Sequence, residues 1–194
     1  MTTQNTNELI KISFKTLKEM LTDRNINVNS LDNITEEELI SLHNKNLIFD
    51  IKVNDELKII YYMGGKLMFK YIQKFIDNDN DKKIIFISKE KMTTNNYKSF
   101  NVYKEFNIDL QFFYIKELLF NIYKHELVPK HEVVPENEIQ DIKDKYLLKN
   151  KYQLPLILST DPICKYLDIK SNNIIKITRP SPTAGEYILY RYVV

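Results

Sequence analysis

Apolar residues recur every three or four positions in the first part of the chain. They are Leu9, Ile12, Leu17, Met20 and Leu21. This spacing places them on one face of a helix, so the pattern predicts an amphipathic helix over residues 7–23. An Asn-rich loop over residues 25–33 should follow. Thr35 and Glu38 then have the spacing of a capping box, which predicts a short helix from Thr35 to about His43.

Short apolar runs predict the strands of the first half. Residues 47–53 and 57–62 flank the turn sequence Asn54-Asp55, so we expect a hairpin. Residues 84–87 are wholly apolar, which is typical of a buried central strand. Further elements are expected to be helices over residues 66–76 and 92–100 and a strand over residues 108–114. This order of elements predicts a mixed sheet with helices packed on it.

The density of proline rises from about Asn121 onward. The helices predicted there run from Pro135 to about Tyr146 and from Asp161-Pro162 to about Leu167. The second begins with an aspartate that can cap a helix, followed by proline at the first helical position. Residues 174–178 and 187–193 are predicted strands, and residues 179–186 are predicted to form the loop between them.

The two halves predict two domains of a mixed α/β (α+β) fold. Residues 1–120 should form an N-terminal domain with a mixed sheet and helices. Residues 121–194 should form a smaller C-terminal α/β domain. Because its last predicted element is a strand, we expect the C-terminus to be held in a sheet.

The charge of the chain argues against a generally basic surface for nucleic acid. The 194 residues carry a formal net charge of +2. From Asn121 onward there are 11 basic and nine acidic residues, which leaves 17 of each sign before Asn121. Contact with DNA would therefore depend on a local patch, because no overall field steers the protein towards phosphates.

Composition also bears on the compartment. The single cysteine, Cys164, excludes an intramolecular disulfide and a zinc site built from several cysteines. The first residues are polar and lack the apolar core of a signal peptide. No run of about 18 apolar residues is present that would cross a membrane. We therefore expect an intracellular protein without a membrane partner.

Asp50, Glu56 and Lys58 imitate the acid and the Glu-x-Lys pair of metal-dependent nucleases, the main enzyme alternative for this chain. The predicted hairpin would pair Asp50 with Ile59 and leave Glu56 at the turn. Both carboxylates would have to reach one Mg²⁺ ion, so this register disfavours a nuclease.

His125 and His131 are the other candidates for a metal. Two zinc-binding histidines on one helical face stand four positions apart, whereas these stand six apart with Pro129 between them. Cys164 has no histidine beside it in sequence and is expected to pack as a small apolar residue. We therefore expect no metal, no cofactor, no small-molecule ligand and no catalytic residue.

A local basic patch follows the apolar run of residues 84–87. The residues of this patch that we assign to DNA contact are Lys89, Lys91, Thr93, Thr94 and Lys98. Ammonium and hydroxyl groups at the start of a helix can hold a phosphate. Nearby Asp79, Asp81 and Glu90 cancel much of the charge, so the charges by themselves favour a merely solvated face over a phosphate site.

A series of motifs in the last seventy or so residues resembles one known family. In chain order the motifs are HELVPKH at 125–131, YLL at 146–148, QLPLI at 153–157, DP at 161–162 with KYL at 165–167, IIKI at 174–177 with RPS at 179–181, and TAG at 183–185, followed by Tyr187 and Tyr190-Arg191. They match, in order, the family's H-x-L-V-P-x-H, Y-x-L, Q-L-P-x-I, D-P-x-x-x-Y and V-V-K-I-x-R-x-S. The chain thus resembles the fifth subunit of eukaryotic-type DNA-directed RNA polymerases and its archaeal counterpart.

Two further observations indicate which branch of the family the chain resembles. They are its N-terminal part and three positions at which it differs from the family's motifs. The archaeal form lacks an N-terminal domain, whereas this chain resembles the eukaryotic and large-DNA-virus forms, which carry a jaw domain there. The family's glycine before the V-V-K-I strand is replaced by Ser171-Asn172-Asn173, but asparagine tolerates a left-handed turn. Pro182 replaces an acidic residue and Thr94 replaces a proline. These departures, together with a composition rich in Ile, Asn, Lys and Tyr, favour a large-DNA-virus homologue or an otherwise divergent member of the family.

The resemblance implies a non-catalytic subunit of a multisubunit DNA-directed RNA polymerase, active in transcription. Its C-terminal assembly domain would dock on the largest subunit, among other polymerase subunits. The residues expected at this interface are Arg179, Pro180, Ser181, Thr183, Ala184, Gly185, Tyr187 and Arg191. Arg179 stands at a strand end, where its planar fork suits a carboxylate.

The same resemblance places the N-terminal jaw domain beside downstream duplex DNA, which it would contact non-specifically. The protein would work in a virion or a cytoplasmic viral factory if viral, and in the nucleus if cellular. A free-standing protein-interaction adaptor is the remaining alternative function.

Overall fold

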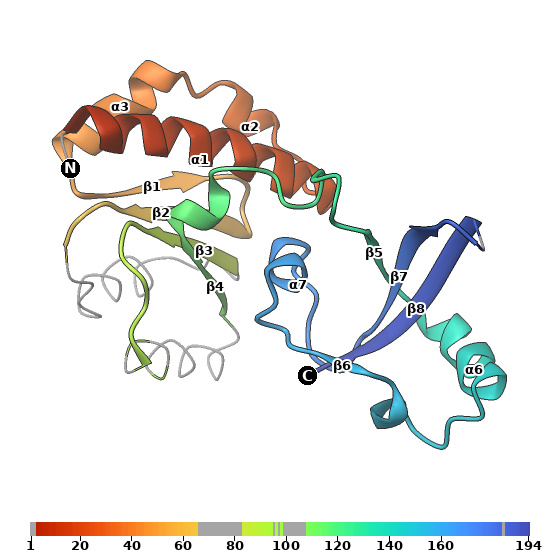
Figure 1. The fold of residues 1–194 in the computed structure, drawn as a ribbon. Coiled ribbons are helices and arrows are strands. Elements are labelled where there is room, and N and C mark those ends of the chain that lie inside the picture. The colour runs from red at the N-terminus through yellow and green to blue at the C-terminus, as the bar shows by residue number, and fades with distance from the viewer. Residues whose placement is uncertain (1–2, 66–82, 95, 97, 99–107, 184) are drawn as a thin grey trace. The chain divides into compact units, whose positions relative to one another are not determined.

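The computed structural model describes residues 3–65, 83–94, 96, 98, 108–183 and 185–194. The chain divides into two compact units, Met1–Phe120 (unit 1) and Asn121–Val194 (unit 2). Each unit has a four-stranded sheet and helices of its own among these residues, so the predicted mixed α/β class is confirmed (Figure 1). The predicted helix over residues 66–76 and much of the one over 92–100 lie outside the described residues.

The elements of unit 1 begin with three helices. In chain order, the described elements of unit 1 are α1 (Thr3–Asp23), α2 (Asn29–Asp32), α3 (Glu36–Lys45), β1 (Ile48–Lys52), β2 (Leu57–Tyr62), β3 (Lys83–Ser88), β4 (Asp109–Tyr114) and the 3-10 turn η1 (Ile115–Leu118). The predicted capping box is confirmed, because the Thr35 hydroxyl accepts from the Glu38 amide and the Glu38 carboxylate accepts from the Thr35 amide. The one-turn helix α2 lies in the predicted loop, where burial of Leu31 holds it against the core.

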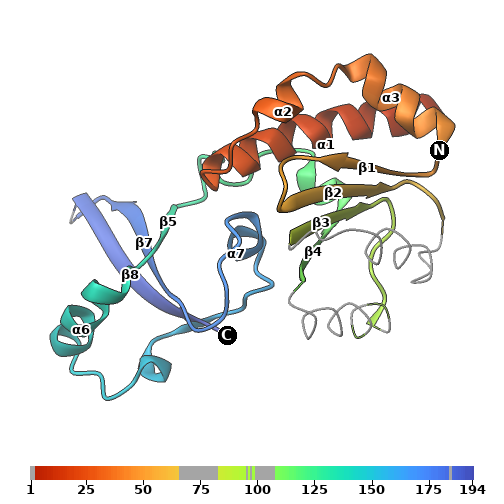
Figure 2. The same ribbon diagram turned by 180° about the vertical axis from the view of Figure 1, so that it is seen from behind.

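The sheet of unit 1 has the order β1-β2-β3-β4. β1 runs antiparallel to β2, and the other neighbours are parallel. Helices α1, α2 and α3 lie on one side of this sheet in both views (Figures 1 and 2). The buried face of α1 consists of Ile10, Phe14, Leu17, Met20 and Leu21, whereas Ile12 of the predicted stripe is exposed and Leu9 is half-buried. On the buried face the Ser13 hydroxyl lies 3.5 Å from the hydroxyl of Tyr61 on β2.

Strand β3 is buried on both faces, as its continuous apolar sequence predicted. On one face Phe86 lies in a cluster with Tyr62 and Phe112, whose ring centroids are 6.5 and 6.0 Å from its own. Ile85 and Ile87 point to the other face, where they are fully buried. This two-sided burial makes the centre of the sheet the core of unit 1.

Unit 2 is built around a long hairpin. Its elements are β5 (Lys130–Val133), α6 (Glu136–Lys145), the 3-10 turn η2 (Lys151–Gln153), β6 (Leu156–Ile157), α7 (Pro162–Tyr166), β7 (Ile174–Ser181) and β8 (Gly185–Val193). The strand order is β5-β7-β8-β6, with β7 antiparallel to both β5 and β8, and β6 parallel to β8. The prediction of a loop over residues 179–186 is therefore wrong, because most of that segment extends the two strands.

The two faces of this sheet pack on different helices. Ile174 and Tyr192 share one face and pack against Ile139 and Ile142 of α6. Ile175 belongs to the opposite face, in a second cluster with residues of α7. Because side chains alternate along β7 and β8, the sheet of unit 2 has two faces. We call the face that packs on α6 the α6 face and the opposite one, which packs on α7, the α7 face.

Local hydrogen bonds hold the remaining connections of unit 2. The Asp161 carboxylate accepts from the Ile163 amide at 3.0 Å, which confirms the predicted cap of α7. Asn172 has φ of 73°, so asparagine does adopt the left-handed turn, and its side chain accepts from the Tyr192 hydroxyl at 2.6 Å. The Val194 carbonyl accepts from the Ser159 amide, so the last strand is held in the sheet. No helix in the described part of the chain is long and apolar enough to cross a membrane.

Candidate functional site

The outer half of the β7–β8 hairpin is largely exposed. Its register runs from Ile174 opposite Tyr192 to Ser181 opposite Gly185. Near the helices the hairpin is buried, with Ile175 at 0% exposure, whereas Tyr187 near the tip is 45% exposed. The sheet therefore projects two strands beyond the helices that cover its base.

The structure brings most of the predicted assembly residues together on this outer half, whereas Arg191 lies nearer the base, opposite Ile175. Arg179 lies opposite Tyr187, and its guanidinium carbon is 4.9 Å from the centre of the tyrosine ring. The hydroxyls of Ser181 and Thr183 lie 3.4 Å apart at the tip. Arg191 shares the face of Arg179 and Tyr187 and donates to the Leu156 carbonyl at 3.1 Å. Pro180 and Gly185 are exposed there, and Ala184 lies outside the described residues.

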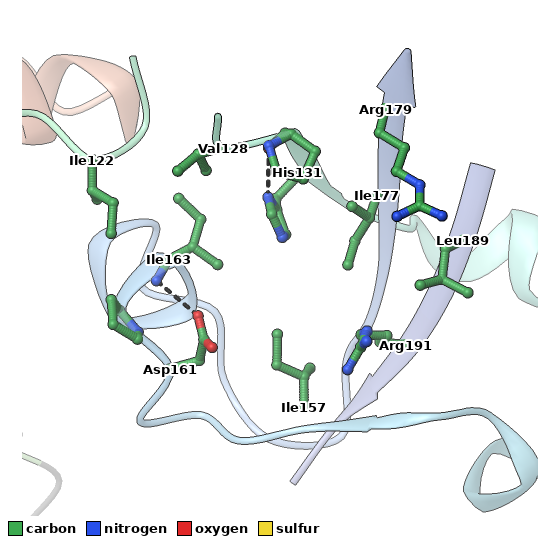
Figure 3. A pocket seen from close by; sticks show the side chains of 12 residues that line it. Ile122, Val128, His131, Ile157, Asp161, Ile163, Ile177, Arg179, Leu189 and Arg191 are labelled. Atoms are coloured by element: carbon green, nitrogen blue, oxygen red, sulfur yellow. Dashed lines mark hydrogen bonds between the residues drawn. The ribbon is translucent and has the colours of Figure 1, made fainter. Parts of the chain in front are cut away.

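A pocket of about 480 Å³ opens on the same α7 face (Figure 3). All four strands contribute to its floor, through His131, Ile157, Ile177, Arg179, Leu189 and Arg191. Its walls are the start of α7 (Asp161, Pro162, Ile163) and the segment before β5 (Ile122, Val128, Pro129). The pocket is thus the part of the sheet face that α7 leaves open, and it adjoins the exposed hairpin.

The charges around this pocket are unbalanced. Arg179 and Arg191 lie on the hairpin side, while Asp161 lies on the opposite wall, where its carboxylate caps α7 (Figure 3). The His131 Nδ1 lies 2.7 Å from the Pro129 carbonyl oxygen, which identifies Nδ1 as the protonated donor. Burial lowers the pKa of His131, and Arg191 lowers it further, against the opposing effects of the Pro129 carbonyl and Asp161. His131 is therefore neutral at physiological pH, and the pocket is net positive.

Protonation of His131 should destabilise unit 2. Because its folded-state pKa lies below the ordinary value of about 6.5, the unfolded chain binds the proton first as the pH falls. Neutral His131 therefore makes its full contribution to the free energy of unfolding above about pH 6.5. This contribution decreases as the pH falls from about 6.5 to the lower pKa of the folded state. Urea unfolding at pH 7, 6 and 5 should show a smaller pH dependence for His131→Gln than for the unsubstituted chain.

His125→Gln is the matched control for this prediction, since His125 is exposed six positions earlier. His43 of unit 1 contributes in the same direction, because burial and Lys89 lower its pKa, so part of the pH dependence should survive in His131→Gln. A His131→Gln variant with the full pH dependence of the original chain would contradict the assignment to unit 2.

The sequence motifs named several pocket residues without indicating that they meet. His131, Asp161, Arg179 and Arg191 come from motifs spread over sixty residues, and only the fold places them around one hollow. The signal that could have found them was the two-residue alternation of β7, which puts Ile175, Ile177 and Arg179 on one face.

The residues predicted to contact DNA differ in how accessible their side chains are to a phosphate. Lys89 is half-buried, and its ammonium donates to the Thr6 hydroxyl of α1 at 3.3 Å. Lys91 is exposed, with its ammonium 5.9 Å from the ring centre of Tyr114. The remaining residues of the predicted patch, Thr93, Thr94 and Lys98, are exposed. Lys89 is therefore the member of the patch least available to a phosphate.

The nuclease-like trio is arranged by a different register from the predicted one. Asp50 lies opposite Ile60 rather than Ile59, because the Asn54 side chain accepts from the Glu56 and Leu57 amides and closes a longer turn. Asp50 and Lys58 share a face, with Lys58 Nζ 3.4 Å from Asp50 Oδ2, and Glu56 stands in the turn. Among the described residues, no three His, Cys, Asp or Glu side chains form a metal-binding group.

Cys164 packs as predicted. It is fully buried in the cluster between α7 and the sheet, and burial raises the pKa of its thiol to about 11. A thiol with such a pKa is protonated at neutral pH, so Cys164 is a core residue of the α7 face.

Comparison with known proteins identifies the family. Residues 120–193 match the family model described as RNA polymerase Rpb5, C-terminal domain. The chain is 30% identical over 196 residues to "DNA-directed RNA polymerases I, II, and III subunit rpabc1" of Dictyostelium discoideum, covering 97% of this chain and 98% of that one. It is 45% identical over 85 residues to the RPABC1 subunit of Caenorhabditis briggsae, covering 44% of this chain and 40% of that one.

Another relative matches with higher identity over a shorter stretch. The chain is 51% identical over 74 residues to "DNA-directed RNA polymerase subunit Rpo5" of Staphylothermus marinus, covering 38% of this chain and 80% of that one. The match to the Dictyostelium subunit extends over nearly the whole of both chains, so it includes unit 1 as well. The chain therefore belongs to the Rpb5 family of RNA polymerase subunits.

Proposed function

We propose that this protein is a non-catalytic subunit of a multisubunit DNA-directed RNA polymerase. The observation that carries the proposal is the match along nearly the whole chain to a relative named as a subunit of RNA polymerases I, II and III. A large-DNA-virus origin stays a prediction from composition and the three motif departures.

We further propose that unit 2 docks on the largest polymerase subunit through the outer half of the β7–β8 hairpin. The exposure of Arg179, Tyr187 and the tip supports this role, because the strands extend beyond the helices of their own unit. An exposed tyrosine and arginine in contact are typical of residues that contribute strongly to binding.

Affinity purification tests the assignment. The tagged full chain, expressed in its native cells, should co-purify with a complex of several hundred kilodaltons that contains the largest RNA polymerase subunit. Recovery of other partners without polymerase subunits would favour the adaptor alternative. Magnesium-dependent DNA cleavage by the purified chain, lost in Asp50→Ala, would favour the nuclease alternative.

Unit 1 is proposed to act as a jaw beside downstream duplex DNA. The exposed side chains of Lys91, Thr93, Thr94 and Lys98 support a local, non-specific contact with phosphates. Lys89 is also part of the predicted patch, but its hydrogen bond to α1 competes with such a contact.

Removing the exposed lysines should weaken the salt dependence of DNA binding. For assembled polymerase that binds duplex DNA, the logarithm of the association constant decreases linearly with the logarithm of the salt concentration. The steepness of this line should be reduced by about 0.9 for each removed lysine that contacts a phosphate. Lys91→Gln/Lys98→Gln should therefore bind with a shallower slope, whereas Lys89→Gln should match the unsubstituted chain. An unchanged slope in the double variant would show that the patch is only solvated.

A further inference from the structure

The pocket on the α7 face lies where the hairpin emerges from the core of unit 2. Along β7 the exposure rises from 0% at Ile175 to 7% at Ile177, and Arg179 beyond them is exposed. Along β8, Val193 is fully buried, Arg191 and Leu189 are half-buried, and Tyr187 is exposed. The α7 face thus passes gradually from core to open surface, and the pocket lies at this transition.

The lining of the pocket favours an aliphatic guest. The apolar side chains around it are Ile122, Val128, Ile157, Ile163, Ile177 and Leu189. Figure 3 shows Ile157, Ile177 and the ring of His131 directed into the hollow. Its volume of about 480 Å³ falls in the range of roughly 300–1,000 Å³ that is typical of binding pockets. Because His131 is neutral, it adds no charge to this interior.

The two arginines of the rim favour negative charge in the guest. Within the described residues neither Arg179 nor Arg191 forms an ion pair with a carboxylate, and Arg191 uses one nitrogen on the Leu156 carbonyl. A polypeptide that covers the pocket removes water from both guanidinium groups. An arginine desolvated without an acceptor would oppose binding, so the covering segment has to supply one. A carboxylate is the acceptor that fits the planar fork of arginine best.

We propose that this pocket receives an aliphatic side chain of the docked polymerase subunit, and that an aspartate or glutamate beside it in sequence pairs with Arg191. The inference rests on the proposed docking of unit 2, and it adds the chemistry of the segment recognised. The tip of the hairpin then provides exposed contact area, and the pocket beside it provides selectivity for an acidic-aliphatic sequence.

Site-specific photocrosslinking in the assembled polymerase tests the proposal. A benzophenone-bearing amino acid is placed in the full chain at Leu189 in the pocket, at Tyr187 on the exposed hairpin, or at Ile188. Ile188 is the matched control, because it is the sequence neighbour of both and points to the α6 face. Crosslinked peptides are then identified by mass spectrometry, and the melting temperature of each variant is compared with that of the unsubstituted chain.

The expected result is crosslinking from Leu189 and Tyr187 to one segment of the largest subunit that contains adjacent aliphatic and acidic residues, with little product from Ile188. Crosslinking from Tyr187 but not from Leu189 would overturn the pocket proposal and leave docking intact. The absence of products from both positions would overturn both proposals. Products that join two copies of this chain, or that join Leu189 to a segment without acidic residues, would also overturn the pocket proposal.

A charge-removal series avoids the bulky probe. With a synthetic peptide of the crosslinked segment, Arg191→Gln should raise Kd about tenfold or more, as expected for loss of a charged hydrogen bond. Lys176→Gln, on the α6 face of β7, should leave Kd unchanged within about twofold. Replacing the acidic residue of the peptide with its amide should have no further effect on Arg191→Gln, because the two changes remove the same contact. The proposed pairing would be overturned if the amide peptide bound Arg191→Gln more weakly than the acidic peptide does, by the same factor as it does the unsubstituted chain. Equal Kd values for Lys176→Gln and Arg191→Gln would also overturn it.

Discussion

Arg179→Ala is expected to raise the Kd of the chain for the largest polymerase subunit about 30-fold or more, a loss typical of an arginine at the centre of an interface. The side chain is exposed, yet its guanidinium carbon lies 4.9 Å from the centre of the Tyr187 ring, a cation–π contact that favours this position of the side chain. This contact reduces the entropy that Arg179 loses when it pairs with a carboxylate. Titration of labelled full-length chain against the purified largest subunit measures the change.

Two variants separate a specific contact from a general loss of charge. Arg179→Lys keeps the positive charge but lacks the bidentate fork, so it should retain only part of the affinity. Lys145→Ala breaks a similar contact on α6, where the ammonium lies 5.7 Å from the ring centre of Tyr146, and should leave Kd unchanged. Equal affinities for Arg179→Ala and the unsubstituted chain would contradict docking through the hairpin.

Phe86→Ala should destabilise unit 1 by about 3–5 kcal/mol, the range for removal of a buried aromatic ring. Phe86 is fully buried at the centre of β3, between the rings of Tyr62 and Phe112. Its removal leaves a cavity that the flanking strands cannot close without shifting. The loss is large compared with the stability of about 5–15 kcal/mol that is typical of a folded protein.

Urea unfolding followed by tyrosine fluorescence and circular dichroism measures this loss. Phe120→Ala is the matched control, because the Phe120 side chain is 55% exposed, and it should cost less than about 1 kcal/mol. A Phe86→Ala variant as stable as the Phe120→Ala variant would mean that the centre of this sheet does not carry the stability of unit 1.

Elements set by local chemistry were predictable from the sequence. The capping box at Thr35, the cap at Asp161 and the apolar run of β3 each depend on residues close together in the chain. Strands β5 and β6 were not predicted, because each is short and pairs with a strand more than thirty residues away. Both strands form only because they pair with the hairpin that they flank, and the local pattern of apolar residues does not reveal this distant pairing.

The extension of the hairpin was missed because Pro180 suggested a loop. The structure explains why proline is tolerated there. β5 ends its pairing with β7 at Lys130 opposite Thr178, so Pro180 lies beyond the neighbouring strand and its missing N–H would have met no acceptor on that side. The pocket was unpredictable for a related reason, since its residues meet only when four strands are aligned.

The pairing of Ser181 with Gly185 has an evolutionary consequence. Only residues 182–184 separate these partners, and Gly185 has φ of 73°, a conformation that favours glycine. An insertion or deletion of a single residue in one of the two strands would shift its register against the other, so Arg179 would no longer share a face with Leu189 and Arg191. Related chains should therefore vary freely in side-chain type at Pro182, yet keep the number of residues between Arg179 and Arg191 constant.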